Sequence, residues 1–174
     1  MSKNAFSMLE LVFVIIIVGI IVGSALPKQT DGNNEDDINK IKSTINFTKH
    51  LAINDYKYKD EAEWWKHLWR ISFIDNSMVV WQDSNGDTNI DEDEIAKLSA
   101  SSTKKMDGRT NKSYSVSNNI IATMDSVCFD RFARAIDCET IGDHPYDREF
   151  KDVNITYNND KLTIYSRTGY IEEN

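Results

Sequence analysis

The chain has 174 residues, of which 40% are hydrophobic and 28% are charged, and its formal net charge is −8. This length suits one ordinary domain with an appendage. The excess of acids argues against nucleic-acid binding, because phosphate recognition needs clustered Lys and Arg. A mean hydropathy of −0.49 argues against a protein with many membrane spans.

The apolar residues are concentrated near the N terminus, in segment 6–26, which reads FSMLELVFVIIIVGIIVGSAL. At about 1.5 Å per helical residue, a segment of this length matches the ~30 Å hydrocarbon core of a bilayer. Lys3 precedes it and several acids follow it. The positive-inside tendency therefore predicts a single membrane-spanning helix with the rest of the chain outside the cytoplasm.

Glu10 lies inside this apolar segment, and three interpretations compete for it. The segment is a signal peptide with a small-residue cleavage site at 23–25, a plain anchor, or a segment in which Glu10 has a function. A carboxylate within a membrane segment costs roughly 2.5–3.5 kcal/mol, so it usually marks a function and has a partner. Since no charged residue follows within the run, that partner must come from another chain or from a new N terminus.

Residues 3–11, KNAFSMLEL, resemble the class III signal of type IV pilins and type II secretion pseudopilins. The resemblance implies a leader, 1–5, which a prepilin peptidase removes between Ala5 and Phe6, and N-methylation of Phe6. It also implies that Glu10 pairs with the amine of a neighbouring subunit during assembly. Pro27 falls at the family's usual helix-interrupting position, whereas Ala5 replaces the family's usual Gly.

A second helix is predicted after Pro27, with Asn34 as its cap and acids in its first turn. Its apolar positions form one stripe: Ile38, Ile41, Ile45, Thr48 and Ala52. The resemblance implies that this stripe packs on an antiparallel sheet. The expected fold is α+β and pilin-like, with one long N-terminal helix whose first half spans the membrane and whose amphipathic second half packs on that sheet. The expected regions are 1–5 (leader), 6–27 (transmembrane and assembly helix), 28–54 (amphipathic helix) and 55–174 (β-rich head).

The head is predicted to be built mainly from short strands. Apolar and β-branched residues predict strands at 78–81, 95–98, 114–116, 120–122, 153–157 and 162–165. Segment 158–160 predicts a hairpin turn, and 99–112 a solvent loop. A short helix is expected over 60–69.

An acidic stretch, 83–94, reads DSNGDTNIDEDE and follows the spacing of a calcium-binding EF-hand loop. Its candidate ligands occupy positions 1, 3, 5, 7, 9 and 12 of that pattern: Asp83, Asn85, Asp87, Asn89, Asp91 and Glu94. Thr88 stands where the pattern requires Gly, and the flanks are predicted strands. The stretch also resembles the strand-loop-strand of GspH/FimT-type pseudopilins, in which no metal is needed. A weak calcium site and a solvated acidic hairpin therefore both remain open.

Cys128 and Cys138 are the two cysteines of the chain, and in an exported domain such a pair predicts one disulfide. The histidines are dispersed, which disfavours a zinc site. No nucleotide-binding Gly loop, nucleophile elbow or metalloprotease motif occurs in the sequence, and no catalytic residue or further cofactor is predicted.

Together these features predict a structural subunit, a minor pilin or pseudopilin of a type IV pilus or type II secretion system, and not an enzyme. The expected location is the bacterial inner membrane, with the C-terminal domain in the periplasm, followed by incorporation into a filament. The expected partners are other pilin subunits, the prepilin peptidase and the inner membrane, and no nucleic acid. The alternative is a periplasmic calcium-dependent binding module exported by an ordinary signal peptide.

Overall fold

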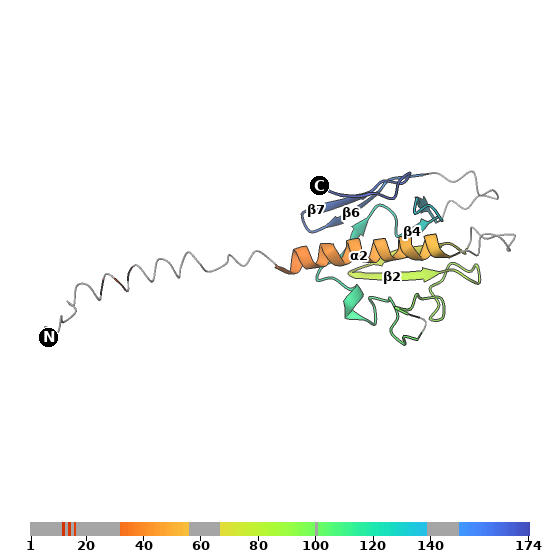
Figure 1. Cartoon of the computed structure of the whole chain (residues 1–174), viewed down its shortest axis with the longest axis horizontal. Helices are drawn as coiled ribbons and strands as arrows, with labels where there is room; N and C mark the ends of the chain where they lie inside the picture. Colours follow the sequence, from red (N-terminus) through yellow and green to blue (C-terminus); the bar gives the residue numbers. More distant parts are fainter. Residues whose placement is uncertain are drawn as a thin grey trace, which may run out of the picture. The chain divides into compact units, whose positions relative to one another are not determined.

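The computed structural model describes residues 12, 14, 16, 32–55, 67–99, 101–138 and 150–174. The chain divides into two units, Met1–Gly32 and Asn33–Asn174. The second unit contains the strands and nearly all of the helix that Figure 1 labels.

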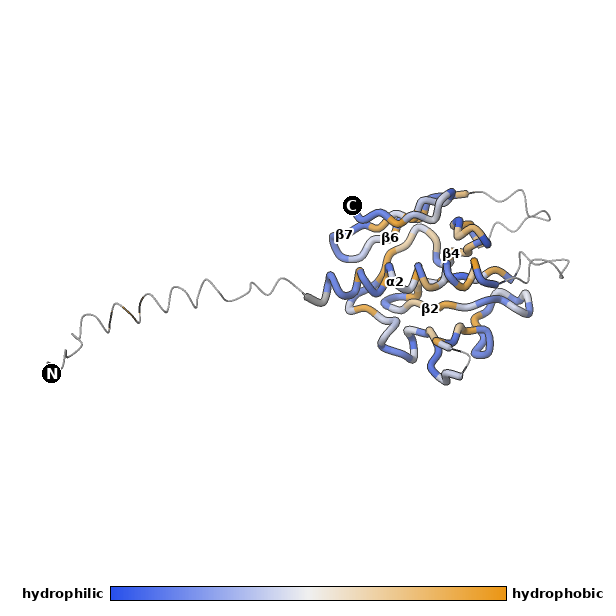
Figure 2. Tube along the Cα trace, in the orientation of Figure 1, coloured by the Kyte–Doolittle hydropathy of each residue, from blue (hydrophilic) through white to orange (hydrophobic). Residues whose placement is uncertain are grey.

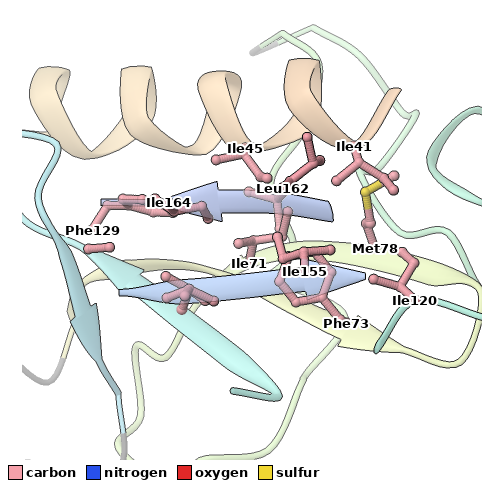
Figure 3. Close-up of a cluster of buried hydrophobic side chains, with 14 of the residues drawn as sticks. Ile41, Ile45, Ile71, Phe73, Met78, Ile120, Phe129, Ile155, Leu162 and Ile164 are labelled. Carbon is pink, nitrogen blue, oxygen red and sulfur yellow. The ribbon is translucent and has the colours of Figure 1, made fainter. Parts of the chain in front are cut away.

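Helix α2 covers Gly32–Asn54 and supplies one side of the core. The predicted stripe is confirmed, because all five of its residues are buried: Ile38, Ile41, Ile45, Thr48 and Ala52. Hydrophobic residues recur along this helix between hydrophilic ones (Figure 2), as expected when one face packs inward. Ile41 and Ile45 point from the helix into the cluster of side chains drawn in Figure 3.

The first sheet is antiparallel with strand order β2-β1-β4-β5. Its strands are β1 (Trp69–Ile74), β2 (Ser77–Gln82), β4 (Ser126–Phe129) and β5 (Ala135–Asp137). A two-residue turn joins β1 to β2, and its first residue, Asp75, has a φ of 52°. Asp is one of the few residues that tolerate this left-handed conformation.

The second sheet is also antiparallel, with strand order β3-β6-β7-β8. Its strands are β3 (Ile121–Ala122), β6 (Val153–Tyr157), β7 (Asp160–Ile164) and β8 (Ile171–Glu173). Burial alternates along β6, as expected for a strand with one face on the core. The predicted hairpin turn is confirmed between β6 and β7, where Asn158 has a φ of 55°.

One core cluster draws residues from α2 and from both sheets, among them Ile45, Ile71 and Ile155 (Figure 3). Strand β2 is buried along its whole length. Met78 and Val80 belong to the main cluster, whereas Val79 and Trp81 form a second cluster with Ile95. The segment that follows β2 therefore folds back over that strand.

The predicted fold, a long N-terminal helix packed on one antiparallel sheet, is wrong. The helix that packs on the head is α2, which begins at Gly32, and the described strands form two sheets. The sequence pattern gave no sign of the division into two sheets, because strand pairing depends on contacts between distant segments.

The prediction of a single-pass inner-membrane protein is also corrected. Within the part of the chain that the structure describes, no helix combines the length and the apolar character that a membrane crossing requires.

Several local predictions need correction as well. Segment 95–98 forms isolated bridges, Trp81 to Ile95 and Lys97 to Lys105, in place of a strand. The 3-10 helix η3 (Lys112–Tyr114) overlaps the strand expected at 114–116. Trp69 begins β1, although it was expected to end a short helix, and residues 60–66 of that helix lie outside the described residues. β1, β4, β5 and β8 were not predicted.

Candidate functional site

The acidic loop, residues 83–94, begins directly after β2 and ends where Ile95 bridges back to Trp81. Ile95 belongs to the second apolar cluster, and the partly buried Ile90 packs against that cluster. These two apolar side chains hold the loop against β2. The first and last acids of the loop are consequently buried, and its middle is exposed.

Asp83, the first residue of the loop, is buried and both of its carboxylate oxygens are engaged. Oδ1 accepts a hydrogen bond from the Gly86 amide at 2.7 Å, and Oδ2 accepts one from the Thr88 amide at 3.2 Å. The Nη2 atom of Arg70 lies 3.5 Å from Oδ2. The buried carboxylate of Asp83 thus fixes the backbone of the turn through its hydrogen bonds to the Gly86 and Thr88 amides.

The turn itself contains two residues in the left-handed region, Gly86 with a φ of 79° and Thr88 with a φ of 64°. Thr88 therefore adopts the conformation for which the EF-hand pattern uses Gly. The presence of Thr in place of Gly at position six therefore does not argue against the EF-hand pattern, because the backbone of Thr88 adopts the conformation that the pattern requires.

The exposed middle of the loop is ordered by its own side chains. Asn85 Oδ1 accepts from the Asp87 amide at 2.9 Å, and Asp87 Oδ1 accepts from the Asn89 amide at 2.8 Å. The hydrogen bond from Asn89 lowers the pKa of Asp87. The Nδ2 atom of Asn85 donates to Asp91 Oδ2 at 3.1 Å. These contacts place Asn85, Asp87, Asn89 and Asp91 along one exposed turn.

Glu94 closes the loop and is only 6% exposed. Its Oε1 accepts hydrogen bonds from the Ser84 amide at 2.6 Å, from the Ser84 hydroxyl at 2.7 Å and from the Asn85 amide at 3.2 Å. Burial raises the pKa of Glu94, but these hydrogen bonds outweigh it and the pKa falls below its usual value. Oε2 is buried, and no donor among the described residues reaches it.

Arg70 is the functional candidate that sequence reasoning missed. It is 3% exposed and its guanidinium lies 4.5 Å from the centre of the Trp81 ring. Burial lowers its pKa, while the charges of Asp83 and Glu94 raise it. The sequence signal that could have identified it is its place in the apolar run WRISFI, because a cation buried in such a run needs acids nearby.

The loop is not a preformed metal centre. Within residues 12, 14, 16, 32–55, 67–99, 101–138 and 150–174, no three His, Cys, Asp or Glu side chains are gathered as metal ligands. Calcium at Asp83, Asn85, Asp87, Asn89, Asp91 and Glu94 therefore stays a prediction, which the backbone of the turn favours.

The predicted disulfide is present between Cys128 in β4 and Cys138 just after β5. Their Cα atoms are 5.3 Å apart, a distance typical of disulfides. The bond closes the end of the β4–β5 hairpin at the edge of the first sheet.

The remaining site predictions concern Ala5, Phe6 and Glu10, and all three lie outside the described residues. No family model matches the chain, and no curated protein and no solved structure shows a significant match to it. The resemblance to pilins therefore rests on the sequence of residues 3–27 and of the acidic loop.

Proposed function

We propose that this protein is a structural subunit of an assembled filament, a minor pilin or pseudopilin of a type IV pilus or a type II secretion system. The observation that carries the proposal is the apolar segment 6–26, which contains a single carboxylate, Glu10, four residues after Phe6. An apolar segment of this length needs an apolar environment, which identical segments of neighbouring subunits provide in a filament core.

The described residues of this segment agree with such a role. Val12, Val14 and Ile16 have helical backbone, and their side chains are 49%, 48% and 53% exposed. Packing against the same residues of other subunits would remove them from water.

Glu10 fixes the register in which the apolar segments of neighbouring subunits pack. Cleavage between Ala5 and Phe6 creates a new N-terminal amine, and Glu10 pairs with that amine of the neighbouring subunit. A carboxylate left without a partner in a low-dielectric core is costly, so misaligned subunits are disfavoured. The subunit's partners are then other pilins and the prepilin peptidase. The proposal assigns the chain no catalytic step and no nucleic-acid contact.

The test is the incorporation of a Glu10→Ala variant into filaments of the native host, in cells that lack the wild-type copy. We expect the variant to be cleaved and to accumulate normally in cells, but to be missing from purified filaments. Ser7→Ala changes another polar residue of the same segment and serves as the control, which should be incorporated as the wild type is.

Normal incorporation of Glu10→Ala would contradict the proposed role of the carboxylate. A mature chain that begins at Leu26 would instead favour the alternative, a calcium-dependent binding module exported by a signal peptide. Protein levels in whole cells, measured by immunoblot, separate failed assembly from degradation.

A further inference from the structure

The acidic loop, residues 83–94, concentrates negative charge in a short stretch of the chain. It contains six acids and no base. Arg70 lies beside the buried Asp83, and Lys105 pairs with the exposed Glu92 at 3.0 Å. Within the described part of the chain, these two cations face six carboxylates, and the excess of negative charge favours binding of a cation.

The buried end of the loop holds a carboxylate oxygen in need of a partner. Glu94 is 6% exposed, and its Oε2 receives no hydrogen bond within the described part of the chain. A buried, unsatisfied oxygen on a charged group costs free energy unless something positive compensates it. The other oxygen, Oε1, is held by Ser84 and Asn85, so the carboxylate already lies against the first turn of the loop.

The backbone of that first turn has the form that a twelve-residue calcium loop requires. The sharp turn falls at its sixth residue, Thr88, where φ is 64°. The carboxylate of the first residue, Asp83, accepts a hydrogen bond from the Thr88 amide, which closes the turn. The first, third and fifth residues, Asp83, Asn85 and Asp87, therefore share one compact turn.

We propose that residues 83–94 bind one calcium ion, with Glu94 supplying the carboxylate that closes the site. In the pattern, side-chain oxygens of Asp83, Asn85 and Asp87, the backbone carbonyl of Asn89, and Asp91 acting through water complete the ligand set. The described structure does not gather these side chains as metal ligands. Calcium binding therefore requires Glu94 Oε1 to leave its hydrogen bonds to Ser84 and Asn85 and turn toward the ion. Arg70 stabilises Asp83 in the metal-free loop.

This inference does not rest on the proposed filament function. The site belongs to the unit Asn33–Asn174, whereas the assembly residues belong to Met1–Gly32. Each proposal can therefore fail while the other holds.

The first experiment measures the melting temperature of the full chain, treated with a chelator and then titrated with calcium or magnesium chloride. With a Kd of about 10⁻⁴ to 10⁻³ M, ~10 mM calcium should raise the melting temperature by a few degrees in a saturable manner. Magnesium should do much less, since it favours small octahedral sites. No shift with calcium, or an equal shift with magnesium, would overturn the proposal.

The second experiment measures calcium affinity by calorimetry for three variants that each remove one carboxylate. Glu94→Gln and Asp87→Asn should weaken calcium binding ~10-fold or more, because both residues occupy ligand positions. Asp93→Asn removes the same charge from an exposed position between ligands and should stay within ~2-fold of wild type. Asp87 is itself exposed, so its variant folds even where Glu94→Gln does not. Equal effects of Asp87→Asn and Asp93→Asn would overturn the proposal.

Discussion

At the scale of single residues, Asp37 links the helix to the rest of the head. It is 3% exposed, and its carboxylate accepts hydrogen bonds from the Tyr157 hydroxyl at 2.7 Å, the Ser117 amide at 2.9 Å and Lys40 Nζ at 3.1 Å. Burial acts to raise the pKa of Asp37, but these hydrogen bonds outweigh burial and lower the pKa from its ordinary value of 3.8 to about 2. The ionised carboxylate therefore stabilises the folded state.

This shift predicts a defined pH dependence. Because the pKa is lower in the folded state, the stabilisation of about 2 kcal/mol is present above pH ~4 and is lost as the pH falls through ~2. Asp37→Asn should lower the free energy of unfolding by about that amount at pH 7, and the difference from wild type should shrink to less than ~0.5 kcal/mol near pH 2. Urea unfolding at both pH values measures this. Asp36→Asn, which changes the exposed neighbouring residue, is the control. If Asp37→Asn lowers the free energy of unfolding at pH 7 by no more than Asp36→Asn does, the role of Asp37 is refuted.

Gly169 is a second residue whose identity the structure explains. Its φ is 64°, and a Cβ at this position would lie 2.0 Å from the backbone oxygen of Ala133. Its carbonyl also accepts a hydrogen bond from Lys49 Nζ at 2.7 Å, which ties the segment before β8 to α2. A side chain at this position would have to displace backbone.

Gly169→Ala should therefore lower the free energy of unfolding by about 2–4 kcal/mol. The matched control is Gly86→Ala, since Gly86 also has a positive φ, 79°, but an added Cβ there meets nothing within 4 Å. The control should cost only ~1–2 kcal/mol, from strain alone, when both variants are measured in chelator. If the two variants lose the same stability, the close contact with Ala133 has no energetic effect.

At the residue scale, chain spacing alone selects the candidate ligands within 83–94. The structure shows that this loop forms one compact turn, and calcium binding there stays a prediction. Arg70 was missed, because a charged residue in an apolar run is not expected to be buried until its partners are known. Its position beside Asp83 depends on the pairing of β1 with β2.

At the scale of elements, α2 shows what hydrophobic periodicity can predict. Its five stripe residues are spaced for one helix face, and burial follows from that spacing. The β6–β7 hairpin was also predictable, because its alternation and its Asn-Asn turn are local features. The short β5, with three residues, carries too little pattern to be recognised from sequence.

The packing of α2 can be tested within the helix itself. Ile45 is 0% exposed in the main core cluster, so Ile45→Ala should lower the free energy of unfolding by about 2–5 kcal/mol. Ile53 is 47% exposed on the same helix, so Ile53→Ala, the control, should cost less than ~1 kcal/mol. Chemical denaturation of both variants measures the difference. Similar losses for both would show that the buried face of α2 has been misassigned.

At the scale of the whole molecule, the two-sheet arrangement could not be predicted because its pairings join distant segments. Ser72 of β1 pairs with Ser126 of β4, and Ala135 at the edge of the first sheet donates to the carbonyl of Ser166, next to the second sheet. No local pattern encodes such contacts. The net charge is better understood from the sequence, since the acidic loop alone contributes six of the eight excess negative charges.

The filament proposal makes one claim about the whole chain that is direct to measure, the identity of its mature N terminus. Mass spectrometry of the protein isolated from its native host should find a chain that begins at Phe6 and carries a methylated amine. An Ala5→Leu variant, which enlarges the residue before the cut, should remain uncleaved. A mature chain that begins at Leu26, or one that retains Met1–Ala5, would contradict the account.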